Sequence, residues 1–166
     1  PEPLLALVAG SPDGSPAQRD GVRRILASRA LREDDLQNPA ALPFGELERD
    51  EYLRGGGQPA RVAMVCAGKH AGMLCACALQ GWPLASYRQL DHPLQRAIAE
   101  HMSELAGAPP GATSVDGCGA PAHAFRLREL AVALRAVVQA APGSPERRIA
   151  DAMRAKATVP VVVMPP

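Results

Sequence analysis

The sequence has 166 residues, which is enough for one domain around a single hydrophobic core. Apolar residues make up 47% and charged residues 21%, with a formal net charge of +1, so the composition is that of a folded chain. The near-neutral charge gives no reason to expect nucleic acid as a partner. No apolar run approaches the roughly 20 residues that a membrane-spanning helix needs, so we expect no membrane span.

The first half of the chain predicts two helices separated by turn-rich connections. An apolar run at residues 4–9 leads into a loop rich in glycine, serine and proline. Ser15 and Pro16 then open a helix, because serine is a favoured N-cap and proline is favoured at the first helical position. A charged helix follows at about 44–54 and ends in three glycines. The expected buried side of the first helix is Val22, Ile25, Leu26 and Leu31.

Residues 64–80 are apolar nearly all round, which predicts a central, buried helix. Gly68 and Gly72 are poor helix formers, and their presence indicates close approach of another segment. The next helix is predicted at about 93–106, with Asp91 or His92 as its cap.

A long glycine- and proline-rich loop is predicted from 107 to 119, followed by helices at about 123–140 and 144–156. Residues 159–164 have the pattern of a β-strand that has no partner in the sequence, so we expect a homodimer or a missing sheet. The fold class predicted overall is mainly α with little β.

Cysteine usage favours a reducing, cytoplasmic setting. The chain has four cysteines, and Cys75 and Cys77 lie two positions apart on a predicted helix. They point to different faces and cannot easily bridge. A chain of this length and apolar content does not need disulfides for stability. We interpret both residues as small buried hydrophobic side chains.

The first cluster with chemical potential is Cys66, Lys69 and His70, which helical spacing would place on one face. Burial disfavours a charged ammonium, and a neutral lysine can act as a base or as a metal ligand. A structural interpretation competes with this one: a helix start in which Lys69 reaches solvent and His70 satisfies a backbone carbonyl. A third hypothesis is a cysteine hydrolase with Cys66 as the nucleophile and Lys69 as its base.

The second cluster is the segment Asp116-Gly117-Cys118-Gly119, where two glycines flank a thiol. On its own it is also compatible with a plain turn. The two clusters together supply thiols, an amine, an imidazole and a carboxylate, and that set could hold one metal ion, although the spacing is not that of a zinc ribbon or finger. Ser11 and Ser15, with Asp13 between them, are weaker candidates because loop serines commonly form turns.

Five ordered motifs carry a resemblance to a known family. Residues 66–74 match Cys-Ser-Gly-Lys-His-Ala-Gly-Met-Leu with alanine in place of the serine, and residues 116–121 match Asp-Gly-Cys-Gly-x-Pro. Residues 91–95 resemble Asp-His-Pro-x-Gln, and 31–36 and 148–154 fit two further family segments. Over about residues 4–157 the chain resembles the L-asparaginase II family of the rhizobial, thermolabile type.

The resemblance implies hydrolysis of L-asparagine to L-aspartate and ammonia, on a scaffold similar to the helical part of the serine β-lactamase and glutaminase fold. It also implies a zinc ion near the substrate. The residues that carry over are Ser11 as a catalytic serine, Asp116, Gly68 and His70 on the substrate side, and Cys66, Lys69 and Cys118 as zinc ligands.

The resemblance further implies an incomplete domain over residues 1–166. The chain does not begin with methionine, and the family's serine–lysine pair and a further lysine would lie before residue 1 and after residue 166. Two hypotheses follow. The chain is an asparaginase-type amidohydrolase or a segment of one, or it is a truncated, catalytically inactive homologue that binds a metal or a small molecule.

Overall fold

The computed structural model describes residues 2–156. Within them the chain forms seven α-helices, two short 3-10 helices and one antiparallel pair of strands, which confirms the predicted class of mainly α with little β. The strand predicted at 159–164 lies outside the described residues. The elements are α1 (Glu2–Ala9), α2 (Pro16–Ala27), η1 (Glu33–Asp35), α3 (Glu46–Arg54), η2 (Arg61–Ala63), α4 (Ala67–Gln80), α5 (Pro93–Ala106), β1 (Ala112–Val115), β2 (Pro121–Ala124), α6 (Leu127–Gln139) and α7 (Pro145–Lys156).

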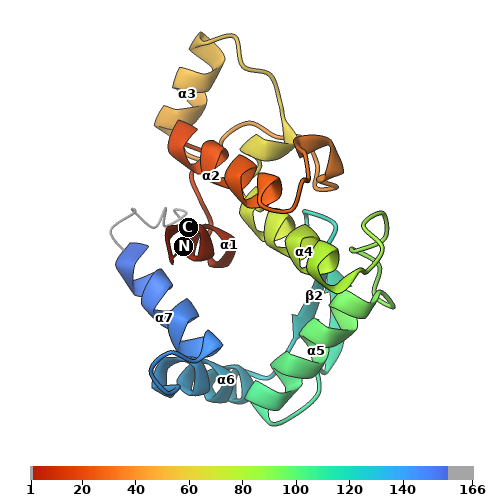
Figure 1. The fold of residues 1–166 in the computed structure, drawn as a ribbon. Coiled ribbons are helices and arrows are strands. Elements are labelled where there is room, and N and C mark those ends of the chain that lie inside the picture. The colour runs from red at the N-terminus through yellow and green to blue at the C-terminus, as the bar shows by residue number, and fades with distance from the viewer. Residues whose placement is uncertain (1, 157–166) are drawn as a thin grey trace.

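Five of the helices are arranged as a ring (Figure 1). In order around it, α1 packs on α4, α4 on α5, α5 on α6, α6 on α7, and α7 returns to α1. The first and the last helix of the described chain are therefore in contact. The apolar run at residues 4–9, for which the sequence predicts no structure, is part of α1. No helix within residues 2–156 combines the length and the apolar character needed to cross a membrane.

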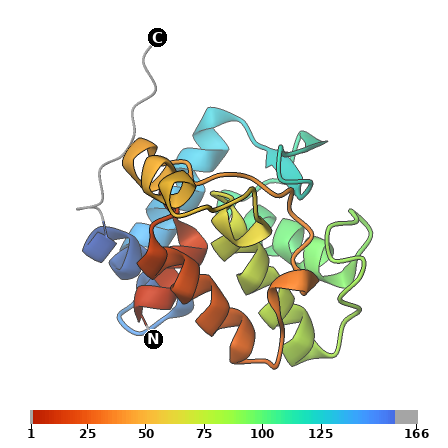
Figure 2. The same cartoon turned by 90° about the horizontal axis from the view of Figure 1, so that it is seen from above.

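The core lies between α2 and α4, which run side by side (Figure 2). Both helices present small or branched apolar side chains to each other, so their backbones approach closely. The polar side chains of His70 and Gln95 are also buried, and each forms a hydrogen bond with Tyr87. The buried apolar cluster consists of Val22, Ile25, Leu26, Leu36, Val62, Ala67, Ala71, Leu74, Cys77, Tyr87 and Leu94.

The predicted helix starts are confirmed where a capping residue marked them. α2 begins at Pro16 with Ser15 as the N-cap, although the Ser15 side chain makes no capping hydrogen bond. His92, and not Asp91, caps α5: its Nδ1 accepts a hydrogen bond from the backbone N–H of Leu94 at 3.1 Å. In α7 the Ser144 hydroxyl accepts from the N–H of Arg147 at 3.2 Å.

The predicted boundaries are wrong in two regions of the chain. The helix predicted from residue 64 begins at Ala67, because Cys66 takes a non-helical conformation as its N-cap. The predicted loop 107–119 contains β1, which pairs with β2 in the register Ala112↔Ala124 and Val115↔Pro121. Glycine and proline dominate this stretch and obscure a strand of only four residues. The following helix consequently starts at 127 and not at 123.

The apolar side predicted for α6 is present but lies open to solvent. Leu127 is 83% exposed and Leu134 is 56% exposed. Leu130 and Val138 are exposed as well. The periodicity of the helix was therefore predicted correctly, whereas nothing in residues 2–156 buries this face.

Candidate functional site

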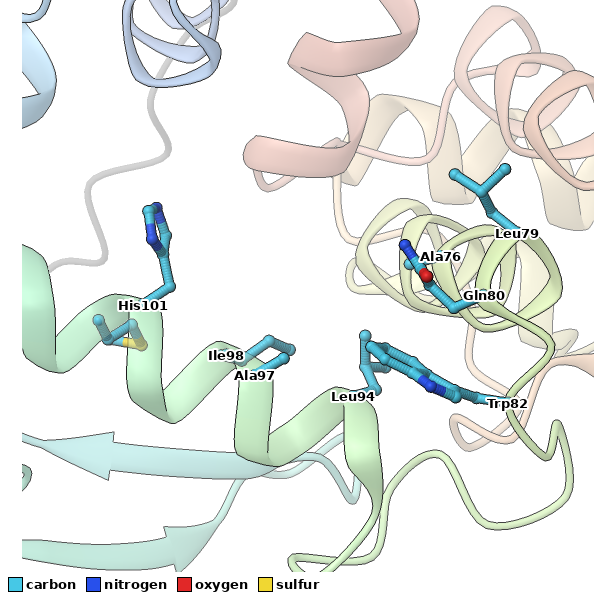
Figure 3. Close-up of a pocket in the computed structure, with 9 residues that line it drawn as sticks. Ala76, Leu79, Gln80, Trp82, Leu94, Ala97, Ile98 and His101 are labelled. Carbon is cyan, nitrogen blue, oxygen red and sulfur yellow. The ribbon is translucent and has the colours of Figure 1, made fainter.

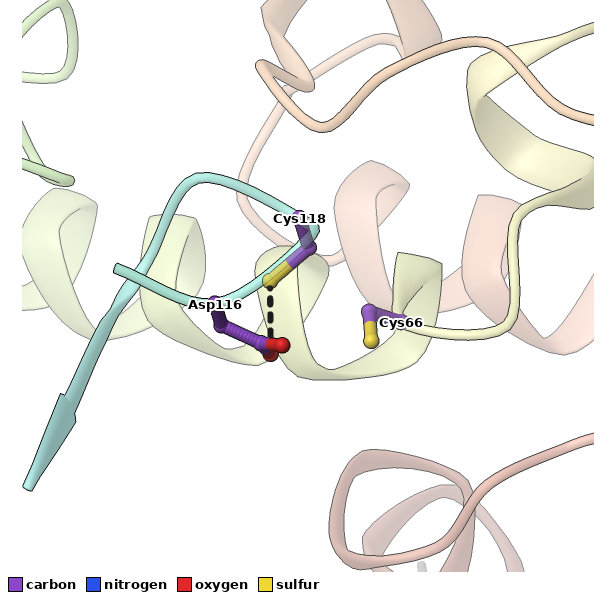
Figure 4. A group of neighbouring side chains, drawn as sticks. All are labelled: Cys66, Asp116 and Cys118. Carbon is purple, nitrogen blue, oxygen red and sulfur yellow. Dashed lines mark hydrogen bonds between the residues drawn. The ribbon is translucent and has the colours of Figure 1, made fainter. Parts of the chain in front are cut away.

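Four of the predicted site residues meet where the start of α4 approaches the tip of the β1–β2 hairpin. Cys66 is the N-cap of α4, and Lys69 lies in the first turn of that helix. Asp116 and Cys118 belong to the turn that joins the two strands (Figure 4). The two segments are 47 positions apart at Lys69 and Asp116, so only tertiary folding brings them together.

The hairpin turn is held in shape by its own backbone. The N–H of Gly119 donates to the carbonyl of Asp116 at 2.8 Å, and the N–H of Asp116 donates to the carbonyl of Ala120 at 2.9 Å. Gly119 has a φ of +83°, a conformation that favours glycine. This shape turns Cys118 inward, where it is 1% exposed, while Asp116 stays at the surface.

Hydrogen bonds connect the side chains of the two segments. Lys69 Nζ donates to Asp116 Oδ2 at 2.9 Å. Cys118 Sγ donates to the same oxygen at 3.2 Å, the bond that is dashed in Figure 4. Cys66 Sγ, Cys118 Sγ and a carboxylate oxygen of Asp116 all lie within 4.8 Å of one another. We call Cys66, Lys69, Asp116 and Cys118 the Cys–Lys–Asp cluster.

The charges of the cluster stabilise one another. The hydrogen bond from Lys69 and that from Cys118 lower the pKa of Asp116 to about 2. Burial acts to lower the pKa of Lys69, but the hydrogen bonds to Asp116 and Cys118 outweigh it and raise that pKa. Burial raises the pKa of the Cys66 thiol, with Lys69 opposing the effect. The cluster therefore contains an ion pair between Lys69 and Asp116 beside the thiols of Cys66 and Cys118.

The donor types of the cluster suit a borderline cation such as zinc. Zinc in proteins is bound by thiolate sulfur, by nitrogen and by carboxylate oxygen, commonly with four ligands. Two sulfur atoms and one oxygen are already grouped within 4.8 Å, and the Lys69 amine is bonded to that carboxylate. A cation among these atoms would favour loss of the thiol protons and of the lysine proton. The residues thus fit a metal ion chemically.

Comparison with known proteins agrees with the two motifs that build the cluster. A sequence model of the L-asparaginase II family matches residues 1–162. The chain belongs to the L-asparaginase II family. The comparison with curated proteins gave no match. Membership places the chain among asparaginase-type amidohydrolases, and the match includes both the α4 segment and the hairpin turn.

The side chain of His70 bonds to the core and not to the cluster, although the spacing predicted one shared face. Its side chain is fully buried, and its Nδ1 lies 2.6 Å from the hydroxyl of Tyr87. The hydrogen-bond partner of His70 is thus the Tyr87 side chain, whereas the structural interpretation of the sequence expected a backbone carbonyl. Burial lowers its pKa to about 4. Its other nitrogen, Nε2, is buried without a partner among the described residues. The structure therefore gives His70 a core position, and its predicted contact with substrate stays a prediction.

The two remaining predicted site residues lie in different surroundings: Gly68 in the contact between α4 and α1, and Ser11 in an exposed loop. A Cβ at Gly68 would collide with the backbone carbonyl of Leu7 in α1, so this glycine permits the close approach that the sequence indicated. Ser11 lies in the exposed loop after α1, and within residues 2–156 its hydroxyl forms no hydrogen bond. The predicted catalytic role of Ser11 and the predicted substrate contact of Gly68 both stay predictions.

Three residues near the cluster carried no motif and were not singled out from the sequence: Gln37, Tyr87 and Arg88. Tyr87 is fully buried and contacts His70. Arg88 packs against Gly119 and bonds to Gln37 at 3.3 Å. A buried tyrosine next to an arginine has no spacing rule that would mark it, so only the tertiary structure reveals this group.

A separate apolar groove of about 380 Å³ lies between the end of α4 and α5 (Figure 3). Trp82 and Ile98 are among its lining residues, and none of the cluster residues belongs to it. His101 is the one ionisable side chain that lines this groove. The groove is thus distinct from the Cys–Lys–Asp cluster, and its lining suits contact with an apolar group rather than catalysis.

Proposed function

We propose that this chain carries the substrate site of an asparaginase-type amidohydrolase, which converts L-asparagine to L-aspartate and ammonia. The observation that carries the proposal is the Cys–Lys–Asp cluster, assembled from two motifs inside a family match that covers residues 1–162. Asp116 is exposed and negatively charged, so it suits the ammonium group of an amino-acid substrate. The carboxamide then lies towards the two thiols.

We further propose that the cluster binds zinc through Cys66, Lys69 and Cys118. A bound zinc ion would act as a Lewis acid on the carboxamide carbonyl or on a water molecule. Coordination by the Lys69 amine requires loss of its proton and rupture of its 2.9 Å bond to Asp116. The Asp116 carboxylate would then be available to a substrate, so metal binding and substrate binding would be linked.

Activity and metal content test the two parts of this proposal separately. We expect ammonia release from L-asparagine by the wild-type chain in the presence of Zn²⁺ and its loss in Lys69→Ala. We also expect one Zn²⁺ per chain, and a Zn²⁺ affinity at least tenfold lower in Cys118→Ser. Cys75→Ser is the matched control, because Cys75 is also a free cysteine but lies on the other side of α4, bonded to Ile25.

A second candidate function is metal or small-molecule binding without catalysis. It is favoured by Ser11, whose hydroxyl forms no hydrogen bond with a base among residues 2–156, since an activated serine needs a base within hydrogen-bond reach. Zn²⁺ binding without ammonia release would support this alternative, and turnover that disappears in Lys69→Ala would contradict it. A reducing compartment suits both functions because all four thiols are free. The homodimer stays a prediction.

A further inference from the structure

The two halves of the Cys–Lys–Asp cluster come from separate elements, so something must keep them together. Every residue of β1 is exposed, whereas Cys118 and Ala120 in the hairpin turn are buried, so the turn and not the strand is packed against the rest of the molecule. The Lys69–Asp116 bond joins two side chains that are 34% and 42% exposed, and an ion pair of this kind contributes little on its own. The geometry of the cluster therefore depends on the residues that pack against the start of α4 and against the hairpin turn.

Tyr87 makes the connection to the α4 half. It is fully buried, and the backbone N–H of Gln37 donates to its hydroxyl oxygen at 3.1 Å. Because the hydroxyl oxygen already accepts this hydrogen bond, the hydroxyl can donate its own hydrogen to Nδ1 of His70, which lies 2.6 Å away. His70 directly follows Lys69, so this bond fixes the helix turn that carries the lysine.

Arg88, the next residue, makes the connection to the hairpin half. Its guanidinium occupies the position that a side chain on Gly119 would need: a Cβ there would contact Nη1 and lie 3.2 Å from Cζ. Gly119 directly follows Cys118. The guanidinium group of Arg88 thus packs against the turn at Gly119, where the absence of a side chain leaves room for it.

Gln37 joins the two connections. Its Oε1 accepts from Arg88 Nε at 3.3 Å, while its Nε2 donates to the carbonyls of Leu84 and Ala85 at 3.1 and 2.9 Å. Its backbone N–H bonds to Tyr87. One residue therefore fixes both Tyr87 and Arg88 and the chain segment that carries them.

We propose that Tyr87 and Arg88 are positioning residues that hold Cys66 and Lys69 in register with Asp116 and Cys118. One side chain acts on α4 through His70, and its neighbour acts on the hairpin turn through Gly119. The separation of the two cluster thiols then depends on two residues that, among the described contacts, form no hydrogen bond with either thiol. This inference rests on the proposed function only in taking the cluster as the site.

Disulfide trapping measures that separation without any metal. A diazene oxidant such as diamide converts two thiols to a disulfide and is itself reduced to a hydrazine, taking up the two protons and two electrons. We expect rapid formation of a Cys66–Cys118 disulfide in the wild-type protein, identified by peptide mass spectrometry. Arg88→Ala, Tyr87→Phe and Gly119→Ala should each slow trapping at least fivefold.

Matched controls separate positioning from a loss of stability. Arg96→Ala, Tyr52→Phe and Gly117→Ala change the same residue types away from these contacts, and a Cβ at Gly117 meets nothing within 4 Å. Val22→Ala weakens the core without touching the cluster. All four controls should trap at the wild-type rate under conditions where every variant is folded by circular dichroism.

Wild-type trapping rates in Arg88→Ala and Tyr87→Phe would overturn the proposal, as would equal slowing in Val22→Ala. Failure of the wild-type thiols to trap would also overturn it. Zn²⁺ titration completes the test, and we expect Arg88→Ala to bind Zn²⁺ at least tenfold more weakly. If the wild-type chain binds no Zn²⁺, the metal part of the proposed function fails, while the trapping rates still decide the positioning roles.

Discussion

Lys69 and His70 are consecutive residues of α4, yet the first lies at the surface and the second in the core. The Lys69 side chain is 34% exposed and bonds to a carboxylate across a gap between two segments. His70 is fully buried and bonds to a tyrosine in the core. Successive residues on an α-helix point about 100° apart, so the helix that delivers a charge to the cluster anchors itself with the next side chain.

The burial of His70 predicts a pH-dependent stability. Burial lowers its pKa from 6.5 to about 4, so folding favours the neutral form. The contribution is present in full above pH 6.5 and is lost as the pH falls through about 4, to a total of roughly 3 kcal/mol. We expect His70→Gln to lose less unfolding free energy than the wild type between pH 7 and pH 4, measured by urea denaturation. His101→Gln, an exposed control, should match the wild type, and equal losses in all three proteins would contradict the assignment.

The sequence predicted the members of the cluster better than its surroundings. Cys66, Lys69, Asp116 and Cys118 have reactive side chains in two marked motifs, and the structure brings them together. The burial of His70 was not predictable, because an imidazole with helical spacing to a thiol also fits a site. Arg88 was not predictable either, because its role depends on the missing side chain of a glycine 31 positions away in the chain.

At the scale of elements, the contact between α1 and α4 depends on the absence of side chains. A Cβ at Gly68 would meet the backbone of Leu7, with its carbonyl carbon at 3.0 Å, and a Cβ at Gly72 would meet Val8 Cγ1 at 2.7 Å. The two glycines are four positions apart and lie on one face of α4. α1 therefore packs directly against the backbone of α4 at these two glycines.

Gly68→Ala and Gly21→Ala form a matched pair that tests this contact. Alanine improves helix propensity by about 1 kcal/mol at either position. At Gly21 the new methyl meets only the flexible end of Leu7, at 2.7 Å from Cδ2, whereas at Gly68 it meets backbone. We expect Gly68→Ala to lose about 1–3 kcal/mol of unfolding free energy and Gly21→Ala to stay within about 1 kcal/mol. Equal effects in thermal denaturation would show that α1 does not approach α4 this closely.

Elements were predictable where a local signal marked them and not where pairing made them. Proline and a capping residue announce α2, α5 and α7. The strand Ala112–Val115 has no such signal: its four residues become a strand through pairing with Pro121–Ala124. A short hairpin whose strands show little alternation is therefore invisible to periodicity.

At the scale of the whole molecule, the ring of helices leaves one apolar face uncovered by the described residues. α6 packs on α5 and α7, yet Leu127, Leu134 and Val138 remain exposed. Exposed leucine side chains on a monomer contribute little to folding, because their burial does not change when the chain unfolds.

Substitution on this face is therefore expected to be mild. Leu134→Glu keeps good helix propensity and should change the unfolding free energy by no more than about 0.5 kcal/mol. Leu74→Ala, in the buried core, should cost about 2–5 kcal/mol. Urea denaturation at several protein concentrations measures both. A loss of 2 kcal/mol or more in Leu134→Glu that grows with concentration would show that a second copy covers α6.

The contact between α1 and α7 has a consequence for the order of events during synthesis. These helices are the first and the last of the described chain, so α7 leaves the ribosome only after all the others. α1 can meet α2 and α4 earlier, but the surface that it offers to α7 stays uncovered until translation of the described chain is nearly complete. Among the helix contacts of residues 2–156, ring closure joins the segments that are farthest apart in the chain, so we expect it to form last. Chaperone binding during translation would act on that uncovered side of α1.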